Sequence, residues 1–142
     1  MLLPNELKQR TGLTRDLVGP YTSMLRSAHG AVAALLQDDK IEAAVTWFDS
    51  GEEEDRPAGV HIRLLVEAGL ITLDYDFSFD GSPDARFIPW SRVHALHVVA
   101  DDGRQTVVAN AWLVTETGTV ELAGGGRAQL SEAVRAAKEY LR

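Results

Sequence analysis

A strict alternation of apolar and polar residues over positions 71–80 is the feature that most constrains the fold of this chain. The apolar set consists of Ile71, Leu73, Tyr75, Phe77 and Phe79. The polar set consists of Thr72, Asp74, Asp76, Ser78 and Asp80. Side chains on a strand point alternately to its two faces, so this pattern predicts a strand with one buried and one solvated face.

Further strand patterns surround this segment, each bounded by turn signals. They cover residues 40–49, 60–67, 86–88, 92–100, 104–115 and 119–123. Ala68-Gly69 and Asp102-Gly103 suit tight hairpin turns. A final helix follows, with an apolar stripe formed by Leu130, Val134, Ala137 and Leu141. Seven short strands and one closing helix predict an α+β fold, built on an antiparallel barrel or sandwich that the helix caps.

The first part of the chain reads as helical. Pro4 and Thr14 suit the starts of two short helices, and Pro20 suits the start of a longer one. In the longer helix, Leu25 and Val32 belong to an apolar stripe. We expect this stripe either to pack on the barrel or to dock on a second subunit. The predicted organisation is one compact domain, with an N-terminal helical segment over 1–39 packed on a barrel over 40–142.

Charge and composition weigh against several kinds of partner. The net charge of −7 is concentrated in residues 41–85, which hold eleven acidic and two basic residues. A negative field repels phosphate backbones and anionic lipids, so nucleic acid and membranes are poor partners. The absence of cysteine excludes disulfides and thiol catalysis. There is no signal-peptide pattern and no long apolar run, so we expect a cytoplasmic protein.

One phrase, Arg86-Phe-Ile-Pro-Trp-Ser-Arg-Val-His-Ala-Leu-His-Val-Val99, is similar to the strand-break-strand segment of bacterial pleckstrin-homology-like proteins. The order of seven strands and a closing helix over residues 40–142 also resembles that superfold. The resemblance implies a binding or scaffolding module rather than an enzyme. Lipid-headgroup binding is not implied, because the loop that is basic in lipid-binding members is acidic here, at Glu52–Asp55. The last helix also lacks tryptophan, and Tyr140 is its aromatic residue.

The candidate metal sites are weak. Residues 76–81 match the first half of a calcium-binding loop, but Phe87 stands where the bidentate glutamate belongs. His94 and His97 would share a helix face, whereas on the predicted strand they point to opposite faces. We therefore expect neither a metal site nor a bound cofactor.

Catalytic and DNA-binding motifs are similarly incomplete. Gly124–Gly126 lacks the Gly-Lys-Ser/Thr ending of a phosphate loop, and no serine lies in a Gly-x-Ser-x-Gly elbow. We expect no catalytic residue and no enzymatic activity. Residues 5–18 resemble the start of a helix-turn-helix with its turn at Gly12, but Gly19-Pro20 shortens the recognition helix to about one turn.

These observations favour a protein–protein binding or scaffolding module of a bacterial cytosol, which acts on another protein or on a second copy as a homodimer. The candidate binding residues are Leu25, Val32, Trp90, Arg92 and Tyr140. Two alternatives stay open. A small acidic chaperone would share this length, acidity and mixed helix–sheet order, and a DNA-binding regulator would use residues 5–18.

Overall fold

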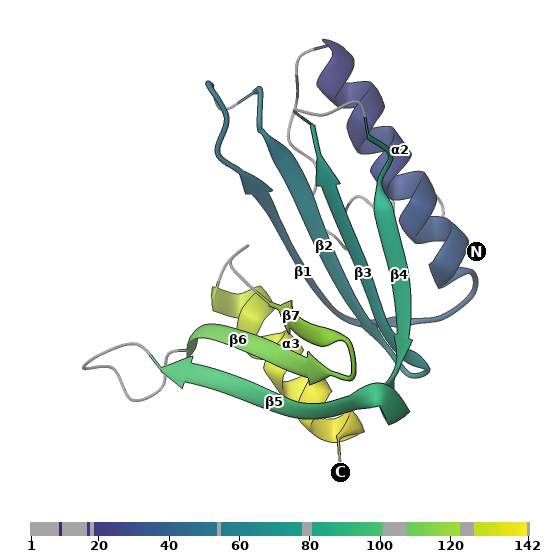
Figure 1. The fold of residues 1–142 in the computed structure, drawn as a ribbon, viewed down its shortest axis with the longest axis vertical. Helices are drawn as coiled ribbons and strands as arrows, with labels where there is room; N and C mark the ends of the chain where they lie inside the picture. The colour runs from purple at the N-terminus through teal and green to yellow at the C-terminus, as the bar shows by residue number, and fades with distance from the viewer. Residues whose placement is uncertain are drawn as a thin grey trace.

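The computed structural model describes residues 9, 17, 19–53, 55–77, 81–100, 108–122 and 127–141. Figure 1 shows helix α2 and strands β1 to β4, followed by β5 to β7 and helix α3. The bounds are α2 Gly19–Leu36, β1 Ile41–Asp49, β2 Gly59–Val66, β3 Gly69–Asp76, β4 Asp84–Pro89, a 3-10 turn Trp90–Arg92, β5 Val93–Ala100, β6 Val108–Thr115, β7 Gly118–Glu121 and α3 Arg127–Tyr140. Neither described helix has the length and apolar character needed to cross a membrane.

The strands form two antiparallel sheets. The first sheet has the order β1-β2-β3-β4 and the second has the order β5-β6-β7. In Figure 1 the strands of the second sheet run across those of the first. The predicted α+β fold with seven antiparallel strands is confirmed at this level.

The β2–β3 hairpin fixes the register of the first sheet. Its two-residue turn, Glu67-Ala68, places Val66 opposite Gly69. Gly69 also lies against β4, where a Cβ atom would come within 2.3 Å of the Ile88 carbonyl oxygen. Only glycine fits this approach, so the residue allows the close packing of β4 on β3.

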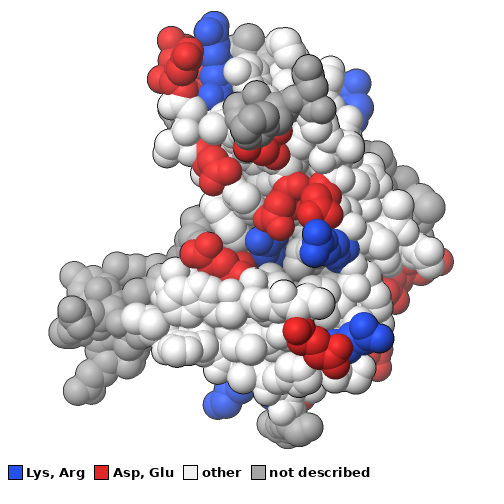
Figure 2. All heavy atoms as spheres, in the orientation of Figure 1, with Lys and Arg blue, Asp and Glu red and all other residues white. Residues whose placement is uncertain are grey.

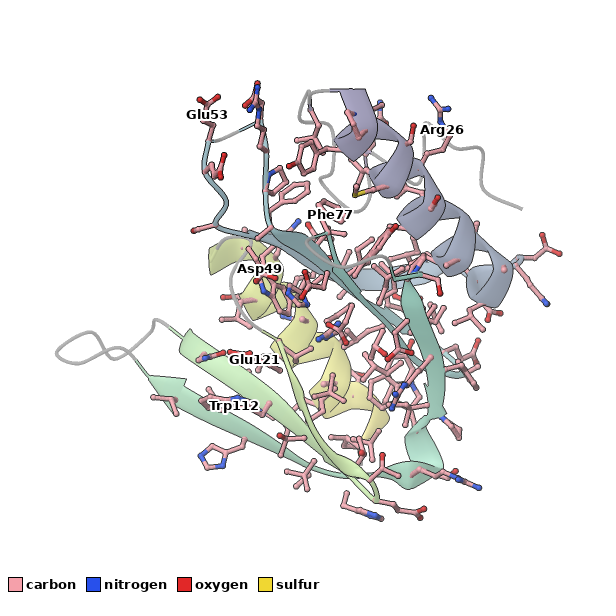
Figure 3. All side chains as sticks on the ribbon, turned by 45° about the horizontal axis from the view of Figure 1, so that its top comes forward. Arg26, Asp49, Glu53, Phe77, Trp112 and Glu121 are labelled. Atoms are coloured by element: carbon pink, nitrogen blue, oxygen red, sulfur yellow. The ribbon has the colours of Figure 1, made fainter. Side chains whose placement is uncertain are left out.

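One face of the first sheet is covered by α2, which lies along it in Figure 1. The helix contributes Leu25, Ala28, Val32 and Leu36, all buried. They meet buried sheet residues that include Val60, Ile62, Leu64, Ile71 and Leu73. Phe77 lies just beyond β3, and its ring centroid is 6.0 Å from that of Tyr21 (Figure 3). The stripe of the second predicted helix therefore packs on the sheet of its own chain.

The opposite face of the first sheet is covered as well. It contributes Ala43, Val45, Leu65 and Leu70 to a second core. The second sheet and α3 supply the other side, with Ala111, Leu113, Leu122, Leu130, Ala133 and Ala137. The first sheet is thus the middle layer of the molecule.

The expectation of a solvated face on β3 holds at Asp76, which is exposed, but this layering overturns it at Thr72. Thr72 is only 4% exposed, and Arg63 beside it on β2 is only 5% exposed. The prediction was wrong here because a second sheet covers polar positions that alternation alone assigns to water.

The predicted barrel is also wrong. Within the described ranges no backbone ladder joins the two sheets. The 3-10 turn Trp90–Arg92 redirects the chain between β4 and β5, and α3 packs against β1 of the first sheet and β6 of the second. One N-terminal helix is described rather than several, and its first residues are Gly19 and Pro20. The predicted shorter helices lie outside the described residues except at Gln9 and Leu17.

Candidate functional site

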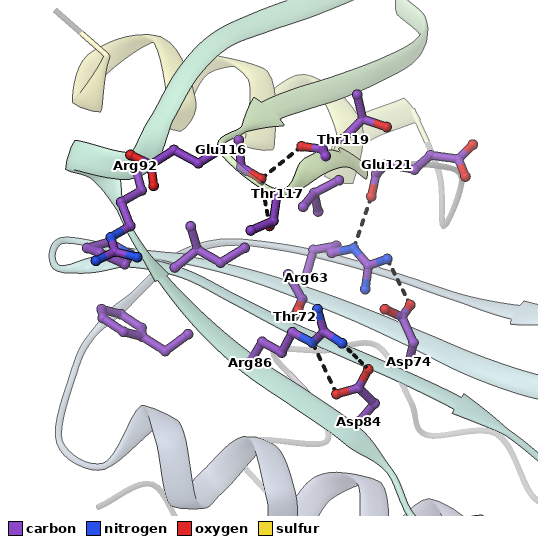
Figure 4. Close-up of a pocket in the computed structure, with 16 residues that line it drawn as sticks. Arg63, Thr72, Asp74, Asp84, Arg86, Arg92, Glu116, Thr117, Thr119 and Glu121 are labelled. Carbon is purple, nitrogen blue, oxygen red and sulfur yellow. Dashed lines mark hydrogen bonds and ion pairs between the residues drawn. The ribbon is translucent and has the colours of Figure 1, made fainter.

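A cleft of ≈ 620 Å³ opens between the two sheets. One wall is β4, and the other is the segment Thr115–Glu121, which covers the end of β6, the turn and β7. Arg63, Thr72 and Asp74 form the floor (Figure 4). Clefts of this size are large enough to bury a ligand or a short stretch of polypeptide.

Both walls of the cleft are edge strands. In the part of the chain that the structure describes, β4 pairs only with β3, and β7 pairs only with β6. Consecutive residues line the cleft, over 86–89 on one wall and 115–121 on the other. Neighbouring side chains on a strand face opposite ways, so a cleft lined by consecutive residues reaches the strand edge itself.

Arg63 ties the floor to the opposite wall. Its Nε donates to the Glu121 carbonyl oxygen on β7 at 3.0 Å. Its Nη1 donates to the carbonyl oxygens of Ile62 and Leu73 at 3.1 and 3.0 Å, and its Nη2 donates to Asp74 Oδ1 at 2.8 Å. A buried guanidinium is costly unless its donors are satisfied, and here they hold two sheets together.

His61 extends this network across the sheet. Its Nδ1 lies 2.6 Å from Asp74 Oδ1, and its Nε2 lies 2.8 Å from Asp49 Oδ2. Its ring stacks on Trp47 at a centroid distance of 4.8 Å. Because both ring nitrogens face carboxylates, the doubly protonated imidazolium satisfies both contacts.

The pKa values follow from these contacts. Burial opposes the charged form of His61, but the hydrogen bonds to Asp74 and Asp49 outweigh it and raise the His61 pKa. Burial likewise opposes the charged form of Asp74, yet the contacts with His61 and Arg63 lower the Asp74 pKa. Both shifts therefore favour the charged forms of His61 and Asp74 in the folded protein.

The side chains of this network are each held by several contacts. A general base needs a ring nitrogen that can reach a substrate proton, and both nitrogens of His61 are engaged. Arg63 also lies over the Trp47 ring at 5.0 Å, which fixes it further. Across the described ranges, no three histidine, aspartate or glutamate residues are placed to hold a metal ion.

This network predicts a pH-dependent contribution to stability. A raised pKa means that folded His61 holds its proton more tightly than the unfolded chain, whose value is 6.5. Its stabilising effect is complete below that value and is lost as the pH rises through the folded pKa. The lowered pKa of Asp74 keeps its contribution present above 3.8. We expect His61→Gln to cost more stability at about pH 5.5 than at about pH 8.5.

Urea unfolding of the unaltered protein and of His61→Gln, each at the two pH values, measures the stability cost of the substitution. Arg86→Gln is the control, because it breaks the exposed Arg86–Asp84 pair at the same cleft without changing the network. Its effect should be small at both pH values. An equal cost of His61→Gln at the two pH values would show that the histidine is not bound between the carboxylates.

The mouth of the cleft combines several kinds of side chain. Arg86 Nη2 lies 3.1 Å from Asp84 Oδ2, and both side chains are exposed. Arg92 has no polar partner among the described residues, and Phe87 is 42% exposed. Threonines line both sides, at positions 72, 115, 117 and 119. Figure 2 shows acidic and basic side chains intermixed at the hollowed waist, so the cleft has no single sign of charge.

The predicted binding residues are placed in three locations. Leu25 and Val32 are 6% and 0% exposed beneath α2. Trp90 and Tyr140 stack at a centroid distance of 4.9 Å, and Trp90 Nε1 donates to the Val66 carbonyl oxygen at 2.8 Å. Arg92 is the predicted residue that lines the cleft. The structure thus joins Trp90 to Tyr140 and leaves the other three apart; a binding role for each stays a prediction.

Sequence reasoning missed the network, although signals for it are present. Arg63 interrupts an otherwise apolar strand, which indicates a buried and paired charge. The turn at Glu67-Ala68 places His61 directly opposite Asp74, whereas we predicted the turn one residue later. A turn one residue later would place His61 opposite Asp76 instead of Asp74, two positions along the same face, and so the pairing was not found.

Several sequence candidates lie outside the described residues. They are Asp102-Gly103, the end of the calcium-like segment at 78–80, the glycines Gly124–Gly126, and the helix-turn-helix-like segment over 5–18 except Gln9 and Leu17. His94 and His97 lie on β5 in the second sheet, whereas His61 lies in the first.

Comparison with protein-family models, with curated proteins and with solved structures gave no match. The functional argument therefore depends on the geometry of the cleft and of the two sheets.

Proposed function

We propose that this chain is a non-enzymatic binding module of the pleckstrin-homology-like superfold, and that its partner is another protein of the bacterial cytosol. The support for the superfold is the division of seven strands into sheets of four and three, followed by one C-terminal helix. The corner Pro89-Trp90 between the sheets matches the strand-break-strand phrase of the sequence.

The partner segment that fits best is an extended peptide, held in the cleft between β4 and β7. The observation that carries this proposal is that both walls of the cleft are edge strands. An edge strand offers unpaired backbone donors and acceptors, and an added peptide strand satisfies them. Pro89, which has no backbone N–H, is compatible with an edge position on β4.

The backbone of β7 supports this mode of binding. The Leu122 N–H donates to the Ala111 carbonyl on β6, so the backbone groups of Leu122 point toward β6. The Glu121 carbonyl points the other way and accepts from Arg63. Directions alternate along an antiparallel ladder, so the N–H of Thr119 also points to the open edge. A peptide laid along β7 can accept a hydrogen bond from it.

The side chains of the cleft suit a polypeptide rather than a polyanion. Phe87, Ile88 and Val120 provide apolar contact area. Arg92, Glu116 and the threonines provide polar contacts of both signs. A phosphate-rich ligand would require an excess of basic groups, which this cleft lacks.

Selection from a displayed library of random linear peptides tests the proposal, because it needs no knowledge of the natural partner. Peptides that bind the unaltered protein are measured against Thr119→Pro and Thr119→Ala by calorimetry. Proline removes the edge N–H and obstructs an added strand, while alanine keeps the N–H. We expect about tenfold or greater loss of affinity with Thr119→Pro and little loss with Thr119→Ala.

Both variants should keep the urea midpoint of the unaltered protein, because position 119 is exposed and its edge N–H is not used by β6. Equal binding by the proline and alanine variants would refute strand addition on β7. Failure to select any peptide that competes for the cleft would refute peptide binding as the function.

A further inference from the structure

We propose that β5 is a self-association surface, through which two copies of the chain pair antiparallel along their free β5 edges. In Figure 1, β5 forms an edge of the second sheet, and among the described strands it pairs only with β6. The pairing would join two three-stranded sheets into one continuous sheet of two chains. It leaves the cleft between β4 and β7 unoccupied by the second copy.

The distribution of exposed apolar side chains points to β5. Three large hydrophobic residues are exposed among the described residues, namely Phe87 at 42%, Val98 at 39% and Val99 at 42%. Two of the three are adjacent on β5 and therefore lie on opposite faces of the sheet. A strand added beside β5 covers part of both faces, whereas a partner docked on one face covers only one of the valines.

The composition of β5 distinguishes it from the other edge strands. β1 contains Glu42 and Asp49, β7 contains Glu121, and β4 contains charged residues together with Pro89. Charges and proline are the usual protection of an edge against pairing. β5 reads Val-His-Ala-Leu-His-Val-Val-Ala and has no acidic residue, lysine, arginine or proline. Among the described edge strands, β5 is the one that lacks both a charged Asp, Glu, Lys or Arg side chain and a proline.

The backbone of β5 is also arranged for pairing. Its register against β6 is regular from Ala95 to Val99, between two irregularities. The Ala111 carbonyl on β6 accepts a hydrogen bond from the Leu122 N–H, so the backbone N–H and carbonyl of Ala111 point toward β7. Those of the next residue, Trp112, therefore point toward β5. Trp112 pairs with His97, so the backbone groups of His97 point toward β6. Because backbone directions alternate along a strand, the N–H and carbonyl of the next residue, Val98, point to the free edge.

A second copy is the occupant that the charges favour. In an antiparallel pairing about a two-fold axis, β5 meets itself, and an uncharged strand brings no like charges together. Residues 86–142, which contain the second sheet, hold seven basic and six acidic residues. The strongly acidic part of the chain, residues 41–85, forms most of the first sheet and stays away from the contact.

Analytical ultracentrifugation of the full chain over a wide concentration range tests this proposal. We expect a reversible dimer for the unaltered protein. Val99→Lys places like charges near the axis and should weaken the dimer at least about tenfold. Val98→Pro removes an edge N–H that β6 does not use and should also weaken it, while Val98→Ala, which keeps that N–H, should retain more of the dimer.

Phe87→Lys is the matched control, because it charges the third exposed hydrophobic residue at the cleft and should leave the dimer intact. Thermal melting confirms that each variant is folded. A monomer at every concentration would overturn the proposal and leave β5 open to a strand of a different protein. Loss of the dimer with Phe87→Lys but not with Val99→Lys would overturn it in favour of the cleft. Neither outcome depends on whether the cleft binds peptides.

Discussion

Arg63→Ala should lower the free energy of unfolding by about 3–5 kcal/mol, the range expected when one partner of a buried charged network is removed. Arg63 is 5% exposed and is the residue that links β2 to the backbone of β7. Its removal leaves the Asp74 carboxylate without its guanidinium partner and removes the donor to the Glu121 carbonyl. Urea denaturation followed by tryptophan fluorescence measures the change.

Two further variants define the cause of that loss. Arg63→Lys keeps the charge but has a single ammonium in place of the planar guanidinium, so it should recover only part of the stability. Arg86→Ala removes an exposed arginine that pairs with Asp84 on the same side of the cleft, and it should cost less than about 1 kcal/mol. A cost for Arg63→Ala as small as that of Arg86→Ala would mean that the two sheets do not depend on this contact.

The sequence specified the strands better than their arrangement in space. Alternation at Ile71 and Leu73 correctly predicted one buried face, because every second residue of a strand shares a face. It could not reveal that a second layer covers the opposite face, because polar side chains such as Thr72 and Arg63 are found both in contact with water and buried against a second sheet. Burial of polar residues depends on partners that lie far away in the sequence, such as the Glu121 carbonyl.

Most of the candidate site could not be predicted from the sequence, because it too is formed by residues that lie far apart in the chain. The cleft combines β4 with β7, which are about thirty residues apart in the chain and belong to different sheets. Of the five candidate binding residues predicted from the sequence, Arg92 lines the cleft and the other four do not. Trp90 and Tyr140 were both singled out, but their stacking depends on α3 folding back to the corner after β4. No periodic pattern carries that information.

The apolar stripe of α2 was open to two interpretations, and its burial leads to the second large expected effect. The stripe lies against the first sheet, and Val32 is 0% exposed. Val32→Asp would place a carboxylate among Leu64, Ile71 and other apolar side chains that offer no counter-charge. Such a substitution is expected to cost more than about 4 kcal/mol, which is most of the stability of an ordinary domain.

Ala34→Asp is the control for this change, because Ala34 is exposed on the same helix two residues further on. An aspartate there has the same intrinsic helix propensity and nearly the same position relative to the helix dipole, so it should cost about 1 kcal/mol or less. Circular dichroism and urea unfolding compare the two variants. Because Ala34→Asp loses more intrinsic helix propensity than Val32→Asp, a larger cost of Val32→Asp can only come from the burial of position 32. If Val32→Asp unfolds no more readily than Ala34→Asp, then α2 does not need its own sheet for stability, and its stripe is available to a second subunit or another protein.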